Sequence, residues 1–571
     1  MKYNFEGRIK SIYLCFVVLT LIGATRLYFL QVVHAQEYKD RQNIIDTRVS
    51  NELFDRGSIY FTEKGDKQNL WNAASLKSGY LMYIKPTEIV DIEKTYTEIS
   101  KFIKIEKDNF IEKANKKDDP YEEIINRVES EIGDKIKDLK LKGVYFQKEQ
   151  WRYYPNNKLA SHVLGFVGYK NDVLQGRYGI ESYYEDNLKR DRTATLKNFF
   201  TELWSNAGKI ASGGENLEAD IITSIEPTVE RMLENELEAV TKKYDSKSSG
   251  GIIMNPTTGE IYAMASYPSF DPNNYNKEKN VAIFSNPLVE RVFEMGSIIK
   301  PITIASGLDQ EIIKASTTYK DEGSLKVSDR TIYNFDFKGR GVVSMQEVLN
   351  QSLNTGSAHV ALLLGKEKFS EYIANFGLGE ETGIDLPGEL PGLFRNFEKG
   401  RDVEVANAAF GQGIAMTPIA TVRALSVLGN GGVLPNPHIV KKVKYKIGTF
   451  KEKNFTEDEM KRVIKAETSE EITRMLVEVF DKALKGGIYK MERNSIAAKT
   501  GTAQIAEKGG GYYKDKFNHT FFGYFPAYDP KFIIFLYTEE PHSDYASNTL
   551  SEPFSKLAKF LINYYHITPD R

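Results

Sequence analysis

Residues 250–265, Gly250-Gly-Ile-Ile-Met-Asn-Pro-Thr-Thr-Gly-Glu-Ile-Tyr-Ala-Met-Ala265, indicate how the C-terminal part of the chain folds. Two apolar runs flank the turn residues Asn255 to Gly259, and this pattern is typical of a β-hairpin. A strand-like run at residues 221–225 and a helical pattern that begins at Pro227 precede the hairpin. The segment therefore predicts the start of a sheet with a helix beside it.

Strand patterns return near the end of the chain, at residues 496–505, 520–524 and 532–538. Because helical segments lie between the early and the late strands, we expect one α/β-type domain over residues 220–571. The composition shifts near Ser212-Gly-Gly214, which indicates a boundary before this domain.

The preceding residues, 34–215, predict a separate non-catalytic domain. Strand-like runs at residues 57–61 and 162–167 enclose a stretch rich in Lys, Glu, Asp and Ile, from about residue 85 to residue 142. Within this stretch the apolar residues follow a helical spacing, as at Ile124, Ile125, Val128 and Ile132. We therefore expect amphipathic helices in an exposed insertion.

The composition fits a globular protein of two or three domains and excludes several functions. The chain has 571 residues, of which 41% are hydrophobic and 27% charged, and its net charge of −2 gives no field that would attract nucleic acid. It contains one cysteine, Cys15, so neither an internal disulfide nor a thiolate zinc site can form.

The N-terminus predicts a membrane anchor. Residues 11–33 are mostly apolar and carry no charge apart from Arg26, and as a helix they would span about 35 Å, enough for a hydrocarbon layer of about 30 Å. Basic residues in segment 1–10 predict that it stays in the cytoplasm and that the rest of the chain crosses. Arg26 is close enough to the C-terminal end of this helix for its side chain to reach the lipid headgroups. A cleaved signal peptide is the alternative.

Three short motifs in the second domain indicate its chemistry, and the first is Ser297-Ile-Ile-Lys300. A serine and a lysine three positions apart on a helix face the same side, so that the lysine nitrogen can reach the hydroxyl. Gly296 permits a tight turn before the helix. A single Ser-x-x-Lys also arises by chance, although this chain has only one.

The second motif is Ser352-Leu-Asn354. The capping-box pattern Ser344-Met-Gln-Glu347 predicts a short helix upstream, so the motif falls in a turn between two helices. A hydroxyl and an amide in such a turn can relay a proton and hold a substrate amide. By themselves they more often satisfy helix ends.

The third motif is Lys499-Thr-Gly-Thr502, on a predicted strand. A strand edge offers backbone groups to an extended peptide, and Gly501 lacks a side chain that would block it. Lys499, Thr500 and Thr502 supply a positive charge and hydroxyls that suit a carboxylate.

The histidines exclude other mechanisms. The seven of them are scattered without metal-ligand spacing. Only His519, near the third motif, is expected to approach the site, and a structural role is the simpler interpretation for it. The chain has no Gly-x-Ser-x-Gly elbow, phosphate-binding loop or dinucleotide fingerprint. We therefore expect no metal and no cofactor.

The order and spacing of the three motifs resemble those of the class B penicillin-binding proteins. The resemblance covers nearly the whole chain. Further matching segments are Arg56-Gly-Ser-Ile59, Tyr154-Pro155, His162 to Gly168, Gly176-Arg-Tyr-Gly-Ile-Glu181, Phe410-Gly-Gln-Gly413 and Thr417-Pro418. The chain departs from the related patterns at Met295, where proline is common, and at Leu353, where β-lactamases often have aspartate.

The resemblance implies a multidomain α/β (α+β) protein: a transmembrane helix, an elongated, dimerisation-like pedestal domain, and a transpeptidase domain whose antiparallel sheet is flanked by helices. It also implies a peptidoglycan D,D-transpeptidase that β-lactams acylate. Ser297 would be the nucleophile, Lys300 the base and Ser352 a proton relay. Asn354 would orient the peptide, while Lys499 would favour the neutral form of Lys300.

By the same resemblance, Thr500 and Thr502 would bind the substrate carboxylate, and the backbone N–H groups of Ser297 and Thr502 would form the oxyanion hole. The implied partners are peptidoglycan stem peptides, β-lactams and a membrane-embedded glycan polymerase of the shape, elongation, division or sporulation type. The implied location is the cell membrane, with the catalytic domain outside. A D,D-carboxypeptidase, a β-lactamase-type hydrolase and a penicillin-binding sensor or scaffold are the alternatives.

Overall fold

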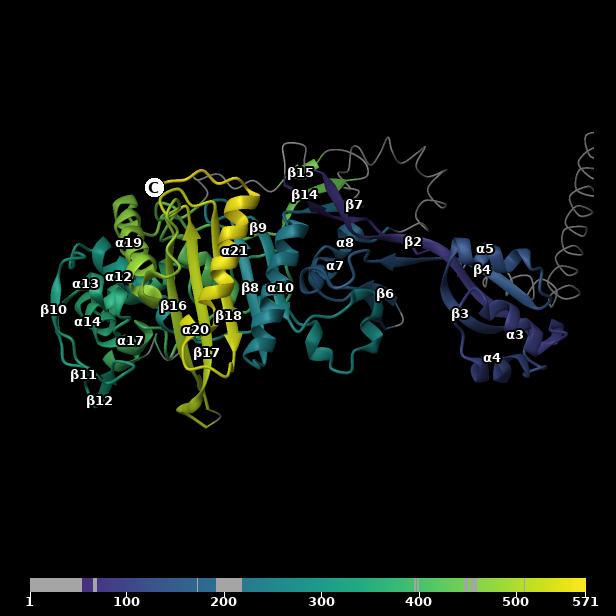
Figure 1. Ribbon diagram of the computed structural model, residues 1–571, viewed down its shortest axis with the longest axis horizontal. Helices are drawn as coiled ribbons and strands as arrows, with labels where there is room; N and C mark the ends of the chain where they lie inside the picture. The colour runs from purple at the N-terminus through teal and green to yellow at the C-terminus, as the bar shows by residue number, and fades with distance from the viewer. Residues whose placement is uncertain are drawn as a thin grey trace, which may run out of the picture. The chain divides into compact units, whose positions relative to one another are not determined.

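The computed structural model describes residues 54–64, 69–171, 173–190, 218–394, 397, 400–445, 450–452, 460–507 and 509–571 (Figure 1). The predicted cytoplasmic segment, 1–10, and the predicted anchor, 11–33, lie outside these residues. None of the helices in the described ranges is both long and apolar enough to cross a membrane.

The chain forms two compact units. The described part of the smaller unit is mainly Ser78–Trp151, and the larger unit contains Arg56–Lys77, Arg152–Arg190 and the described residues from 218 to the C-terminus. Two pieces of the predicted non-catalytic domain are therefore grouped with the C-terminal residues. The boundaries 34–215 and 220–571 stay a prediction.

The smaller unit corresponds to the predicted insertion but is not wholly helical. Its elements are α3 (Ile92–Ser100), α4 (Lys107–Ala114), β3 (Glu122–Glu129), α5 (Ser130–Asp138) and β4 (Val144–Tyr153), together with the second half of β2 (Leu70–Ile84).

The helix predicted from Ile124, Ile125 and Val128 is wrong, because these residues lie on β3. Val128 is opposite Tyr80 and Ile125 is opposite Met82 of β2, in an antiparallel pair. β-branched residues suit a half-buried strand, and this long-range pairing overrides the local helical spacing.

The N-terminal segments of the larger unit surround a buried cluster of charges. They form β1 (Ile59–Thr62), α6 (Ser161–Leu164), β5 (Val167–Lys170), β6 (Val173–Gly176), α7 (Gly179–Tyr183) and α8 (Glu185–Leu188). β1 pairs with β7 (Ala219–Thr223), which also pairs with β14 (Val440–Tyr445), and β14 pairs with β15 (Phe450–Glu452).

The strand predicted at residues 162–167 is wrong over most of its length. The chain forms the short helix α6 and turns at Gly165, which has a positive φ of 72°. A Cβ there would lie 1.8 Å from the carbonyl oxygen of Tyr178, so the turn requires glycine. Only the last predicted residue, Val167, begins a strand.

The buried charges are Arg56 and Glu181, from two segments that the sequence singled out, and Arg152, which it did not. Glu181 accepts hydrogen bonds from Arg56 Nε at 2.6 Å and from Arg152 Nε at 2.5 Å. Burial raises the pKa of Glu181, but the two guanidinium groups hold it below its usual value. The carboxylate is therefore charged and links three distant segments.

The core of the larger unit is a five-stranded antiparallel sheet in the order β16-β17-β18-β8-β9. Its strands are β8 (Ser248–Met254), β9 (Ile261–Tyr267), β16 (Ala497–Ala506), β17 (Tyr512–Phe525) and β18 (Phe532–Glu539). The predicted hairpin at residues 250–265 and the three late strands are present in this sheet.

Helices cover both faces of this sheet, and Figure 1 shows two of them, α10 and α21, which lie on the same face. One face packs against α10 (Pro227–Lys243) and α21 (Ser551–Tyr564), through residues such as Leu233, Phe521 and Phe554. The other face packs against α11 (Pro287–Glu290) and α18 (Pro418–Ser426). The predicted α/β fold, with an antiparallel sheet flanked by helices, is confirmed.

A helical region lies beside β16, at one edge of the sheet. Its helices are η5 (Gly296–Ile299), α12 (Lys300–Asp309), α13 (Met345–Asn350), α14 (Asn354–Leu364), α15 (Lys366–Asn375), α17 (Asp402–Ala408) and α19 (Ala466–Glu478). Two small ribbons belong to it: β10 (Thr318–Asp321) with β13 (Gly341–Ser344), and β11 (Ser324–Val327) with β12 (Arg330–Tyr333).

The remaining short helices of the larger unit are η3 (Pro272–Lys277), η4 (Val281–Phe284), η7 (Val479–Ala483), η8 (Leu484–Gly487) and α20 (Ala546–Thr549), while η2 (Pro86–Glu88) belongs to the smaller unit.

Candidate active site

Ser297 lies in the tight helical turn η5, directly before α12. Gly296 has a φ of 63°, and a Cβ on it would come within 2.8 Å of the carbonyl oxygen of Thr502 on β16. The Gly296 N–H donates to the carbonyl of Gly411 at 3.2 Å. A glycine is therefore needed for the start of this helix to pack against the edge strand.

Lys300, the lysine of the first motif, is fully buried. Its Nζ donates to the hydroxyl oxygen of Ser352 at 3.1 Å and to the carbonyl oxygen of the same residue. Burial lowers the pKa of Lys300 well below its ordinary value, and the nearby charge of Lys499 lowers it further. Both effects favour the neutral form of the amine, which is the form that can accept a proton.

The second motif forms the predicted turn between two helices. Ser344 caps α13 by accepting from the N–H of Glu347, and α14 begins at Asn354. Ser352 has a positive φ of 54°, an uncommon conformation for a residue other than glycine. The Asn354 side chain donates to the carbonyl oxygen of Tyr333 at 2.9 Å.

The third motif lies on β16, as predicted. Lys499 is 3% exposed, and its Nζ donates to the hydroxyl oxygen of Ser352 at 2.9 Å. Burial lowers the pKa of Lys499 to about 7. The hydroxyl of Ser352 is therefore held by two lysine amines from two different motifs.

Gly501 has a packing role that the sequence did not predict. A Cβ at this position would lie 2.4 Å from Thr520 Oγ1 and 2.6 Å from the carbonyl oxygen of Met295. Thr520 donates a hydrogen bond to that same carbonyl at 2.9 Å. The glycine thus allows β16 and β17 to approach the segment that precedes Ser297.

A cleft of about 950 Å³ contains most of the predicted residues. It is lined by Ser297, Ser352, Asn354, Lys499, Thr500 and Thr502. Lys300 and Gly501 are buried and do not line it. A second cavity of about 950 Å³, lined by Lys314, Gln346 and Arg474 among others, includes none of the predicted residues. The first cleft is therefore the candidate active site.

Several cleft residues were missed from the sequence. Tyr333, Phe335 and Phe337 line the cleft and are 48%, 56% and 73% exposed. Tyr545 lines it as well, and its ring centroid is 6.1 Å from that of Phe335. Three aromatic residues within five positions of a loop, Tyr333 to Phe337, were a signal that could have indicated this surface.

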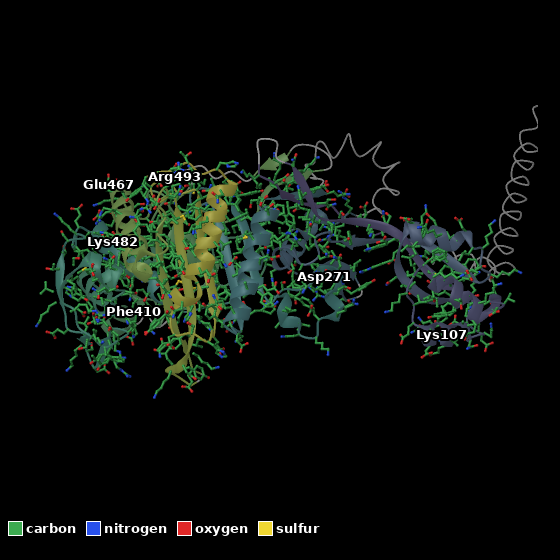
Figure 2. All side chains as sticks on the ribbon, viewed as in Figure 1. Lys107, Asp271, Phe410, Glu467, Lys482 and Arg493 are labelled. Carbon is green, nitrogen blue, oxygen red and sulfur yellow. The ribbon has the colours of Figure 1, made fainter. Side chains whose placement is uncertain are left out.

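Phe410 and Gln412, from one of the matching segments, also line the cleft. Phe410, labelled in Figure 2, packs with Ala358 of α14 and Val403 of α17. His519 is buried opposite Thr502 on β17, and its Nδ1 is 2.9 Å from Thr549 Oγ1. Burial lowers the pKa of His519 to about 4, so the ring is neutral.

This geometry suits acyl transfer. Ser297 is half-buried at the start of a helix and lines the same cleft as Ser352, beside the edge strand β16. The Ser352 hydroxyl is hydrogen-bonded to the amines of two lysines. The fold and these groups define a class of protein, the serine acyl-transfer enzymes that use lysine where other serine enzymes use histidine.

The comparisons with known proteins identify the family within this class. A family model described as the penicillin binding protein transpeptidase domain matches residues 250–559, and one described as the penicillin-binding protein dimerisation domain matches residues 56–195. The chain belongs to the class B penicillin-binding proteins, which are D,D-transpeptidases. The predicted family and enzyme class are confirmed.

Individual relatives agree with this assignment. Stage V sporulation protein D of Bacillus subtilis is 30% identical over 545 residues, which cover 94% of this chain and 82% of that protein. Peptidoglycan D,D-transpeptidase FtsI of Escherichia coli K12 is 26% identical over 460 residues, or 78% of this chain and 73% of that one. Penicillin binding protein 2X of Streptococcus thermophilus has a similar fold, with a TM-score of 0.71 at 19% identity over 90% of this chain and 80% of that chain.

Proposed function

We propose that the protein cross-links peptidoglycan by passing the acyl group of a D-Ala-D-Ala stem peptide through an ester on Ser297. The observation that carries this proposal is the hydrogen bonding of the Ser352 hydroxyl to Lys300 and Lys499, in the cleft that Ser297 lines. The relative FtsI is named a peptidoglycan D,D-transpeptidase, which supports the same substrate.

In the proposed reaction, Ser297 Oγ attacks the penultimate D-Ala carbonyl while neutral Lys300 takes the hydroxyl proton. The C–N bond then breaks, and the proton passes from Lys300 through the Ser352 hydroxyl to the departing amine of the terminal D-Ala. An amine of a second stem peptide attacks the ester, and the proton that it loses returns to Ser297 Oγ through Lys300 as the ester bond breaks. A β-lactam carries a comparable amide and would acylate the same oxygen.

The remaining cleft residues would position the substrate. The backbone N–H groups of Ser297 and Thr502 would stabilise the oxyanion, and each such donor contributes roughly 3 kcal/mol in other enzymes. Thr500 and Thr502 would bind the terminal carboxylate. Asn354 would orient the peptide with its carbonyl oxygen, since its amide nitrogen donates to Tyr333.

The variant Ser297→Ala tests the nucleophile. We expect it to lose covalent labelling by a fluorescent penicillin while its melting temperature stays near that of the wild type, because only one half-buried hydroxyl is removed. Ser306→Ala is the matched control, since Ser306 lies on α12 and bonds to the Ile302 carbonyl within the helix. Labelling that persists in Ser297→Ala would show that the nucleophile is another residue.

We also propose that residues 11–33 anchor the protein in the cell membrane, with the catalytic residues outside and with a membrane-embedded glycan polymerase as partner. The apolar length and the preceding basic residues support this proposal. We expect the full chain to stay in membranes washed at alkaline pH and a chain lacking residues 1–33 to be released. Release of the full chain would contradict the anchor, and purification from membranes without a polymerase would count against the partner.

A further inference from the structure

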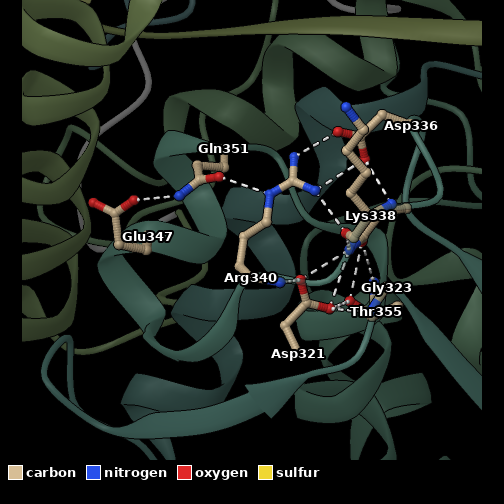
Figure 3. Close-up of polar contacts among 9 residues, drawn as sticks. Asp321, Gly323, Asp336, Lys338, Arg340, Glu347, Gln351 and Thr355 are labelled. Atoms are coloured by element: carbon tan, nitrogen blue, oxygen red, sulfur yellow. Dashed lines mark hydrogen bonds and ion pairs between the residues drawn. The ribbon is translucent and has the colours of Figure 1, made fainter.

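Asp321, at the end of β10, is a buried carboxylate with several donors around it and no part in the proposed reaction. It is 2% exposed. Figure 3 shows its contacts: Oδ1 accepts from Thr355 Oγ1 at 2.8 Å and from Gly323 N at 3.1 Å, and Oδ2 accepts from Arg340 N at 3.0 Å. Asn334 Nδ2 donates to both oxygens. These bonds offset the cost of removing a carboxylate from water.

Arg340 extends the network to the other end of the second motif. Its backbone N–H bonds to Asp321, while its guanidinium donates to Gln351 Oε1 at 2.9 Å and forms a two-point contact with Asp336. Gln351 in turn donates to Glu347 of α13 at 2.8 Å (Figure 3). Gln351 directly precedes Ser352.

The network therefore holds the turn 351–355 at both ends. Arg340 holds Gln351, and Asp321 holds Thr355, which directly follows Asn354. Between them is Ser352, whose positive φ persists only where the surrounding structure fixes it. The same serine bonds to Lys300 and Lys499, so a small movement of the turn would alter both lysine contacts.

We propose that Asp321 and Arg340 are positioning residues for acyl transfer, which hold the turn 351–355 so that the Ser352 oxygen stays between the two lysine amines. This inference rests on the proposed function. Asp321 and Arg340 act through the turn and take no part in bond making. Displacing reacting groups by about 1 Å can slow an enzyme about 100-fold, so the network should affect the rate more than binding.

Two variants weaken the hydrogen bonds of Asp321 in different ways. Asp321→Asn places an amide where one oxygen accepted, so the contact to Arg340 N or the contact to Thr355 is lost. Thr355→Val keeps the side-chain shape but removes the donor to Asp321, and Thr355→Ser restores it. If Asp321→Asn fails to fold, the Thr355 pair still tests the inference.

Asp309→Asn is the matched control. Asp309 is also a buried carboxylate with several donors: Tyr372 OH at 2.5 Å, Lys465 N at 2.7 Å and Thr468 Oγ1 at 2.9 Å. It lies at the end of α12 and does not line the cleft. Its loss should lower stability without moving Ser352.

The measurement is stopped-flow acylation by a fluorescent penicillin at several pH values. It separates the dissociation constant of the initial non-covalent complex from the acylation rate at saturating penicillin. We expect Asp321→Asn and Thr355→Val to lower the saturating rate about 10- to 100-fold, with the dissociation constant within about 3-fold. The acid limb of the rate profile should shift, because Ser352 touches both lysines. Thr355→Ser and Asp309→Asn should keep the wild-type rate and profile.

Wild-type rates in Asp321→Asn and Thr355→Val would overturn the inference. So would an equal loss of rate in Asp309→Asn, which would mean that any loss of stability slows the enzyme. Both results leave the proposed function intact if Ser297→Ala remains unlabelled. Labelling of Ser297→Ala would instead refute the proposed function.

Discussion

At the scale of single residues, the burial of Lys499 in the candidate site lowers the free energy of unfolding. Its side chain is buried and bonds to the Ser352 hydroxyl and the Thr500 carbonyl, and burial lowers its pKa from 10.5 to about 7. Between these two pH values the unfolded chain binds a proton that the folded chain does not. Raising the pH over this interval therefore favours folding, by up to about 1.4 kcal/mol for each pH unit.

Lys499→Met should remove this dependence. We expect the variant to have a larger free energy of unfolding than the wild type at pH 7, and the difference should shrink towards pH 10. Urea unfolding at four pH values measures the difference. A difference that stays the same at every pH would mean that Lys499 is not the source of the pH dependence. We also expect the variant to be acylated slowly.

At the scale of helices and strands, local signals were sufficient where the sequence contains its own turn or cap. The hairpin at residues 250–265, the helix beginning at Pro227 and the cap at Ser344 all have the predicted form. The three motifs also occupy the predicted elements: a helix start, a turn between helices and a strand.

The predictions failed where a distant partner decides the structure. Val128 belongs to a strand because β2 lies beside it, and no spacing within residues 122–129 could reveal that. Asp321 was missed for a similar reason, since its donors come from residues 323, 334, 340 and 355. A buried carboxylate and an exposed one look the same in a sequence.

At the scale of the larger unit, the charges around Glu181 join segments that are far apart in the chain. Glu181→Ala would leave Arg56 and Arg152 buried without their shared carboxylate. Removing one partner of a buried ion pair typically costs about 3–5 kcal/mol. We expect a loss of this size in the free energy of unfolding, measured with urea.

The matched control is Glu238→Ala, on the exposed side of α10. Glu238 pairs with Lys242 at the surface, where ion pairs contribute little. Equal losses in Glu181→Ala and Glu238→Ala would contradict the importance of the buried cluster.

The position of β16 at the outside of its sheet has a consequence for how the protein behaves at high concentration. A strand with one unpaired edge is a template on which a second molecule can assemble, and such edges promote aggregation. Here Thr500 and Thr502 line a recess, and Phe335 and Tyr545, whose ring centroids are 6.1 Å apart, line it as well. We expect a single extended peptide to reach this edge, whereas the sheet of a second molecule should be too wide to pair with it. The recess in which we expect the substrate to bind should thus also protect the protein from edge-to-edge aggregation.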